Sequence, residues 1–248
     1  MRYAMSLAYD GTHFFGWQKQ PNQISVQEEL EVTISKLLGG KAVDLVGCGR
    51  TDAGVHASYF VAHLDLETSI DTNQWVYKLN KMLPNSIVIF SLAEVSNEFH
   101  ARFSAINRTY HYFIHFGKDP FAYNSVQQFQ QLDFKAMNEA AKMLLGTQDF
   151  TSFSKLHTDV KTNICTISNA EWVEIASNKW RFEISADRFL RNMVRAVVGT
   201  LIEVGQGKLS LEQFQTVIHA KDRGASGTSV PARGLFLCEV DYPETNLR

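Results

Sequence analysis

The chain has 248 residues, 45% of them hydrophobic and 20% charged, with a formal net charge of −2, as expected for a soluble globular protein of one large domain or two smaller ones. No apolar run approaches the roughly 18 residues that a membrane span needs. Because residues 1–10 also lack the apolar core of a signal peptide, we expect a cytoplasmic protein with no membrane partner.

The first half predicts the element order β-α-β-β-α-β, the split βαβ or ferredoxin-like unit. The opening strand leads into a loop whose Phe14, Phe15 and Trp17 either fold onto the core or form a surface on which bases stack. The further elements are a helix that Ser25 caps and Gly39-Gly40 ends, strands at 42–46 and 58–64, a helix from Asp71 to before Pro84, and a strand at 87–95.

The second half begins near Ala105 and repeats this plan with insertions. Its elements are a strand at 107–116, a helix from Asp133 to Gly146, a hairpin of 165–173 and 180–185 around Ser177-Asn178, a helix at 190–204, a helix from Ser210, and a strand at 235–240. We therefore predict an α+β fold with two similar ferredoxin-like halves, 1–104 and 105–248.

Charge is distributed unevenly along the chain. Residues 1–99 hold 7 Lys/Arg and 11 Asp/Glu, whereas residues 100–248 hold 17 and 15. A local basic surface in the second half is therefore compatible with nucleic acid, despite the acidic total. The three cysteines, Cys48, Cys165 and Cys238, are far apart and include no Cys-x-x-Cys pair, which argues against a disulfide framework and a structural zinc site.

The glycine-rich loop from Gly47 to Ala57 lies between two predicted strands and holds Arg50 and Asp52 two residues apart. A carboxylate in such a turn can act as nucleophile, general base or metal ligand, but Asp more commonly caps a turn through the backbone. The loop lacks the Gly-Lys-Ser/Thr ending of a phosphate-binding loop. Strand spacing separates His111 from His115 by about 13 Å, too far for one metal ion.

Several segments in order resemble the tRNA pseudouridine synthase A family. They are Tyr9-Asp10-Gly11-Thr12 with Gly16-Trp17-Gln18, the run from Gly49 to Ala57, Phe99-His100-Ala101-Arg102-Phe103, Arg108 to Tyr112, Asp149 to Phe153, Met193-Val194-Arg195 with Gly199-Thr200-Leu201, and Gly234-Leu235. The resemblance spans residues 3 to about 242. It implies that the strands of the two halves form one continuous, mostly antiparallel sheet flanked by helices, with a central RNA-binding cleft. It also implies isomerisation of uridine to pseudouridine in the tRNA anticodon stem-loop, at tRNA positions 38, 39 and/or 40, by a homodimer without cofactor or metal.

The resemblance also implies roles for individual residues. Asp52 would attack the sugar C1′ or the base C6, or remove a sugar proton to give a glycal, after the uridine leaves the helical stack. Tyr110 would stack on the extruded uracil and help to take the C5 proton, and Arg195 would pair with the catalytic aspartate. The substrate-binding residues would be Arg50 at RNA phosphate or the loop backbone, Leu235 at the far side of the uracil pocket, and Arg188 and Arg191 at phosphates.

Two departures from the family pattern and two rival functions stand beside this interpretation. Cys48 replaces a small residue, and residues 155–160 are atypical where an RNA-contacting loop is expected, so the second departure bears on the choice of target uridine and not on the reaction. A non-catalytic RNA-binding module would need its aromatic and basic residues but not Asp52. A phosphate-binding hydrolase would need a metal, for which the sequence offers no convincing ligand set.

Overall fold

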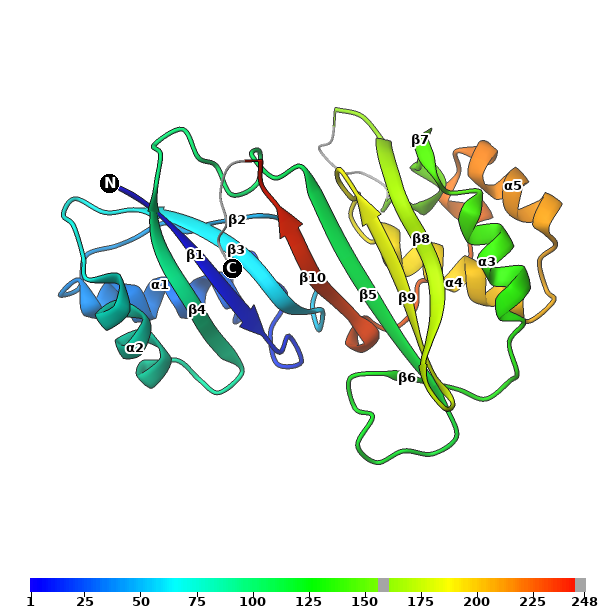
Figure 1. Ribbon diagram of the computed structural model, residues 1–248, viewed down its shortest axis with the longest axis horizontal. Coiled ribbons are helices and arrows are strands. Elements are labelled where there is room, and N and C mark those ends of the chain that lie inside the picture. Colours follow the sequence, from blue (N-terminus) through cyan, green and yellow to red (C-terminus); the bar gives the residue numbers. More distant parts are fainter. Residues whose placement is uncertain (156–160, 244–248) are drawn as a thin grey trace. The chain divides into compact units, whose positions relative to one another are not determined.

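The computed structural model describes residues 1–155 and 161–243, so residues 156–160 of the expected RNA-contacting loop lie outside the described part. The fold is α+β, with mostly antiparallel strands (Figure 1). The chain divides into two compact units, Met1–Asn107 with Phe236–Arg248, and Arg108–Leu235. The closing strand, which the sequence grouped with residues 105–248, thus lies with the first unit from Phe236 onward. None of the described helices is long and apolar enough to cross a membrane.

The first unit contains the predicted β-α-β-β-α-β order. Its elements are β1 (Arg2–Tyr9), α1 (Val26–Leu37), β2 (Val46–Gly47), β3 (His56–Asp65), α2 (Thr72–Met82) and β4 (Ile87–Val95), joined by β10 (Leu235–Asp241). The strand order is β4-β1-β3, and both of these pairings are antiparallel. At one end of β3 the short β2 pairs antiparallel through His63, and at the other end β10 pairs in parallel through His56.

Side-chain alternation explains the core of the first unit. Tyr3, Met5 and Leu7 of β1 are at most 1% exposed, and they share one face of the sheet because successive strand residues point to opposite faces. Leu30 and Ile34 of α1 are fully buried. The predicted Ser25 cap is confirmed, since Ser25 accepts from the Glu28 N–H. Asp71, at which the second helix was predicted to begin, accepts from the Gln74 N–H and caps it.

The predicted strand at 42–46 is wrong, because only Val46 and Gly47 form a strand there. Polar side chains of α1 take the backbone groups that a longer strand would need. The Leu45 N–H donates to Glu31 Oε1 at 3.1 Å, and the Leu45 carbonyl accepts from Gln27 Nε2 at 3.0 Å. The segment before the glycine-rich loop is therefore anchored to α1 instead of a neighbouring strand.

The second unit contains a sheet of order β5-β9-β8-β7, antiparallel throughout, with β6 parallel to β5. Its elements are β5 (Asn107–Phe116), β6 (Val126–Gln128), α3 (Phe134–Lys142), β7 (Gly146–Asp149), β8 (Ile164–Ala176), β9 (Lys179–Ala186), α4 (Met193–Gly205) and α5 (Leu211–Ala220), with 3₁₀ turns at Thr151–Phe153, Arg223–Ala225 and Ala232–Gly234. The predicted β8–β9 hairpin is confirmed, with Ser177 and Asn178 as its loop. The strands β6 and β7 were not predicted.

One asparagine in each unit bonds a helix to both backbone groups of one strand residue. In the first unit, Asn80 of α2 bonds the N–H and the carbonyl of Ile89, each at 2.8 Å. In the second unit, Asn138 of α3 accepts from the Trp172 N–H at 2.7 Å and donates to its carbonyl at 3.1 Å. Each amide thus makes the pair of bonds that a neighbouring strand would make.

Candidate active site

The loop that carries Asp52 lies in backbone contact with the loop that follows β1. The Trp17 N–H donates to the Thr51 carbonyl at 3.3 Å, and the Gly54 N–H donates to the Phe14 carbonyl at 3.2 Å. A Cβ on Gly16 would lie 2.3 Å from the Thr51 carbonyl oxygen, so only glycine permits this approach. The two loops therefore hold each other in place on both sides of Asp52.

A cluster of buried aromatic rings supports the Asp52 loop. Trp17 stacks on Phe60 with 4.1 Å between ring centroids, and Tyr9 packs on the same ring at 5.6 Å. The Tyr9 hydroxyl bonds Thr51 Oγ1 at 2.9 Å. The sequence left open whether this aromatic loop folds onto the core or forms a surface on which bases stack. Trp17 is 3% exposed and folds onto the core, whereas Phe15 is 49% exposed.

His56, at the start of β3, connects these loops to the sheet. Its side chain is fully buried, and its ring stacks on Phe236 of β10 at 4.5 Å. Nδ1 lies 3.1 Å from both the Gly11 N–H nitrogen and Asp10 Oδ1. The nitrogen accepts from Gly11 when it is unprotonated and donates to Asp10 when it is protonated. Either bond fixes the first turn of the loop after β1.

Asp52 is half-buried, and its backbone closes a turn in which the Asp52 carbonyl accepts from the Val55 N–H at 3.1 Å. Any residue type can supply a backbone carbonyl, so this one bond does not depend on the aspartate side chain. Arg50 is exposed. Among the described residues, no group of three or more His, Cys, Asp or Glu side chains could hold a metal ion.

The remaining predicted site residues belong to the second unit. Tyr110 on β5 is half-buried, with its ring edge-on to Phe189 at 5.1 Å. Arg195 on α4 is partly exposed, and its Nε donates to the Val230 carbonyl at 2.7 Å. The Val230 N–H in turn donates to the Arg195 carbonyl at 3.2 Å. The backbone and side chain of Arg195 are thus both attached to the segment that leads toward Leu235.

The other three candidates in the second unit differ in exposure. Leu235 is 5% exposed, at the start of β10. Arg191 is exposed, and its carbonyl accepts from the Lys155 N–H at 3.0 Å. Arg188 is partly exposed, and its backbone N–H bonds Asp187 Oδ1 at 2.7 Å. An exposed cation such as Arg191 suits phosphate contact, whereas the apolar side chain of Leu235 can contribute only by lining a pocket.

Sequence reasoning missed two residues that position the Asp52 loop. Glu31 is 8% exposed, and it accepts from both Gln27 Nε2 at 2.9 Å and the Leu45 N–H. Gln27 also accepts from the Lys19 N–H at 3.0 Å, so this pair joins the segments before and beside the Asp52 loop. The available signal was two polar residues four apart in α1, next to its apolar stripe, where helix neighbours meet.

Comparisons with known proteins agree with one another. A family model described as tRNA pseudouridine synthase matches residues 5–104 and 140–243. The tRNA pseudouridine synthase A of Bacteroides thetaiotaomicron is 53% identical over 246 residues, covering 98% of this chain and 91% of the relative. That of Bacteroides fragilis is 52% identical over 247 residues, covering 98% and 97%. That of Bacillus subtilis is 39% identical over 246 residues, covering 98% and 99%.

Proposed function

This chain belongs to the tRNA pseudouridine synthase family, and on that premise we propose that it isomerises uridine in the anticodon stem-loop of tRNA, at positions 38, 39 and/or 40, with Asp52 as the nucleophile. The family makes the protein an isomerase that acts on tRNA. The choice of stem-loop rests on the resemblance of the Gly49–Ala57 run and the segments that follow it in order.

The observation that carries the role of Asp52 is the fixed position of its loop. Backbone bonds from Trp17 and Gly54, and the close approach of Gly16, hold the chain on both sides of the aspartate. A reacting group held in one geometry lowers the entropic part of the barrier. The proposed reaction needs the carboxylate, whereas the bond from the Val55 N–H uses the Asp52 carbonyl and would survive a change of side chain.

The proposed reaction breaks the N-glycosidic bond of uridine, turns the uracil, and joins its C5 to the sugar C1′. C5 loses its proton and N1, freed from the sugar, gains one, so the product is an isomer of the substrate and no redox partner is needed. Asp52 attacks C1′ or C6, or removes a sugar proton to give a glycal. The uridine must first leave the helical stack, at a cost of a few kcal/mol.

The resemblance assigns residues of the second unit to the same reaction. Tyr110 stacks on the uracil and helps to take the C5 proton, Arg195 pairs with Asp52, and Leu235 closes the pocket. Arg50, Arg188 and Arg191 contact phosphates, which position RNA without reading its sequence. The edge-on packing of Tyr110 against Phe189 supports its role, because it limits the ring to one orientation.

The resemblance extends to the fold and the assembly. We propose that both halves are ferredoxin-like and that the enzyme is a cytoplasmic homodimer. In the first unit, β2, β3, β1 and β4 pair antiparallel in that order, as the split βαβ arrangement requires. In the second unit, the element order β5-α3-β8-β9-α4 supports the same plan.

The test measures tritium release from tRNA labelled at uridine C5, in the presence of a chelator. Asp52→Asn keeps the size of the side chain and removes its nucleophilicity, so tRNA binding survives and release stops. Asp44→Asn is the matched control, because Asp44 is an exposed aspartate eight residues earlier, and it should release tritium at the wild-type rate.

Other outcomes identify which part of the proposal fails. Equal release by wild type and Asp52→Asn would keep the enzyme and remove Asp52 from its mechanism. If wild type binds tRNA but releases no tritium, the non-catalytic RNA-binding module is the better explanation. Release that the chelator abolishes would point to a metal-dependent reaction.

A further inference from the structure

The turn from His100 to Phe103 presents an aromatic ring to solvent. Phe103 is 75% exposed, and the Arg102 guanidinium carbon lies 5.5 Å from its ring centroid. The His100 ring lies 4.3 Å from the same centroid. An exposed aromatic ring beside a cation offers a stacking face and a positive charge to another molecule.

Hydrogen bonds inside the turn fix its shape. His100 Nδ1 accepts from the backbone N–H groups of Arg102 and Phe103, at 3.2 and 3.3 Å. The His100 N–H donates to Ser104 Oγ at 3.0 Å, and the Ser104 N–H donates back to the His100 carbonyl at 2.9 Å. Phe103 therefore stands on an ordered backbone, and its exposure is not a consequence of a loose loop.

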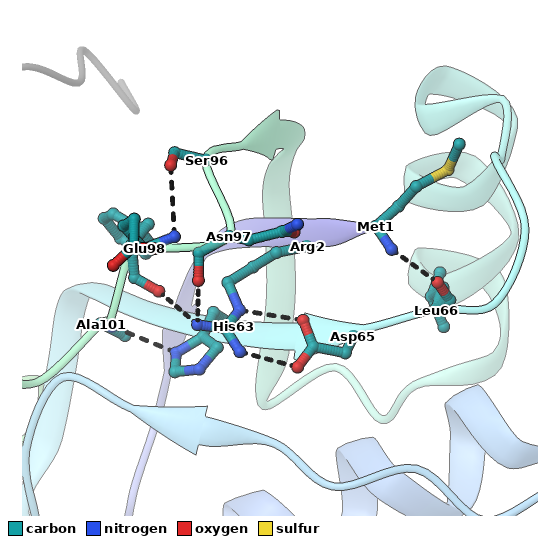
Figure 2. Close-up of polar contacts among 10 residues, drawn as sticks. Met1, Arg2, His63, Asp65, Leu66, Ser96, Asn97, Glu98 and Ala101 are labelled. Atoms are coloured by element: carbon teal, nitrogen blue, oxygen red, sulfur yellow. Dashed lines mark hydrogen bonds and ion pairs between the residues drawn. The ribbon is translucent and has the colours of Figure 1, made fainter.

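The turn is also fastened to the sheet beneath it. The Ala101 N–H donates to His63 Nδ1 of β3 at 3.1 Å (Figure 2), and the Tyr242 hydroxyl donates to the Ala101 carbonyl at 2.6 Å. Burial and the neighbouring charges of Arg2 and His100 lower the pKa of His63 to about 4. The ring is therefore neutral at physiological pH and accepts from Ala101.

Arg2 holds the segment that leads into the turn. Figure 2 shows its guanidinium forked onto Asp65, with Nε and Nη2 bonds of 2.9 and 2.7 Å. Its remaining donor, Nη1, bonds the carbonyls of Asn97 and Phe99 at 2.9 and 2.8 Å. Arg2 is thus bonded to Asp65 and to the segment before the turn, and Arg102 is an exposed residue of the turn itself.

The turn lies on the face of the sheet that the helices leave uncovered. Tyr3 points toward the helices, because its hydroxyl accepts from the Ile70 N–H just before α2, and α1 contacts α2 on that face. Its strand neighbour Ala4 pairs with His63, so both point the other way. His56 is at the Asp52 end of β3, and His63 is seven residues further along the strand. One of these residues is extra at a β-bulge, so the two histidines are about 20 Å apart along β3.

We infer that this turn is a second tRNA contact, at which a nucleobase stacks on Phe103 and Arg102 binds a neighbouring phosphate. The inference rests on the proposed function and extends it to tRNA contact remote from the reacting uridine. An aromatic face beside a guanidinium matches a base and its phosphate, and it does so for any base. A ligand that reaches both ends of β3 must span about 20 Å, as a folded RNA does and a single nucleotide does not.

The first experiment measures affinity for full-length tRNA. Phe103→Ala should weaken binding about 5- to 150-fold, the range for loss of one base-stacking contact. Phe103→Leu should bind tRNA almost as weakly as Phe103→Ala does, because leucine keeps the apolar bulk without a π face. Phe103→Trp should bind tRNA about as tightly as the wild type does. Arg102→Gln should reduce the salt dependence of binding by about one phosphate contact.

The chain offers a matched control in the first unit. Tyr77 on α2 is 66% exposed, and Lys81 lies 5.7 Å from its ring centroid. Helix α2 thus carries an exposed ring beside a cation, as the turn at Phe103 does. Tyr77→Ala should bind tRNA as the wild type does. Equal affinity of wild type, Phe103→Ala and Tyr77→Ala, with tritium release intact in the wild type, would overturn the inference and leave the proposed function standing.

A second experiment locates the partner. A photoreactive phenylalanine analogue at position 103 should cross-link to a tRNA nucleotide away from the target uridine, and the same analogue at position 77 should not. The loss of affinity caused by Phe103→Ala should also be smaller for a short hairpin that holds only the target uridine than for full-length tRNA. Cross-linking of position 103 to a second copy of the chain, with a changed oligomeric state in Phe103→Ala, would replace RNA by protein as the partner. Absence of tritium release by wild type would instead reject the proposed function.

Discussion

Replacing Gly16 with alanine tests whether the contact between the two loops positions Asp52. Gly16 has φ +89, and an added Cβ would lie 2.3 Å from the Thr51 carbonyl oxygen, where ordinary contact begins at 3.4 Å. The loops must therefore separate by about 1 Å. The left-handed backbone costs about 1–2 kcal/mol with alanine, and overpacking adds about 1–3 kcal/mol.

Gly40→Ala separates the two costs. Gly40 has φ +93, and its added Cβ would meet nothing within 4 Å, so this variant carries the backbone strain without the clash. We expect Gly40→Ala to lower the free energy of unfolding by about 1–2 kcal/mol and Gly16→Ala by about 2–5 kcal/mol in total. Chemical unfolding followed by circular dichroism measures both free energies.

Activity gives the sharper comparison between these variants. A displacement of about 1 Å at a reacting group can reduce the rate about 100-fold, so Gly16→Ala should show this loss in kcat for tritium release. Gly40→Ala should keep kcat within about twofold, because its strain lies at the end of α1. If the two variants unfold alike and react alike, the close approach of Gly16 to Thr51 does not position Asp52.

Three further predictions concern buried groups. Tyr9→Phe removes the hydroxyl that bonds Thr51 Oγ1 and should lower the free energy of unfolding by about 1 kcal/mol; an unchanged value and unchanged kcat would show that the bond is dispensable. Burial and, second, neighbouring positive charge lower the pKa of His63 from 6.5 to about 4. As the pH falls from 6.5 to about 4, His63 therefore gains a proton in the unfolded chain but not in the folded chain. Stability should decline there by up to about 3 kcal/mol, and unfolding curves of His63→Gln should lack this component. Burial also raises the pKa of Cys165 to about 12, whereas Cys238 is partly exposed, so peptide mass spectrometry after alkylation at pH 8 should find Cys238 labelled first, and equal labelling would contradict this.

Local chemistry predicted those elements whose signals lie close together in the chain. β5 and β4 begin and end where alternation placed them, and Ser210 forms the full capping box with Gln213. α4 begins at Met193, three residues later than predicted, because Asn192 takes a left-handed φ of 66° and bonds Ser229. The pairing of β6 with β5 joins short segments across an intervening loop, and no residue pattern marks such a partner.

The candidate site was predictable only in part, for a related reason. Charge and spacing alone left Asp52 between a turn cap and a reacting group, and resemblance to a family was needed to favour the second. One structural support of its loop, the bond between Thr51 and Tyr9, could not be predicted, because it joins residues 42 positions apart. The carboxylate of Glu31 lies next to an apolar stripe, where a polar residue commonly faces water, but here it bonds the Leu45 N–H.

The asparagine bonds of Asn80 and Asn138 have a consequence for how the protein behaves in solution. Within the described chain, β7 pairs with β8 over Ile164–Ile167, so Trp172 lies on a part of the β8 edge beyond that partner. An edge strand with open N–H and carbonyl groups is a template for pairing with another molecule. The Asn138 amide occupies both groups of Trp172, and so resists edge-to-edge aggregation. Asn80 does the same for Ile89 on β4. In each unit, a helix asparagine thus blocks the pairing of another strand at one residue of the neighbouring strand.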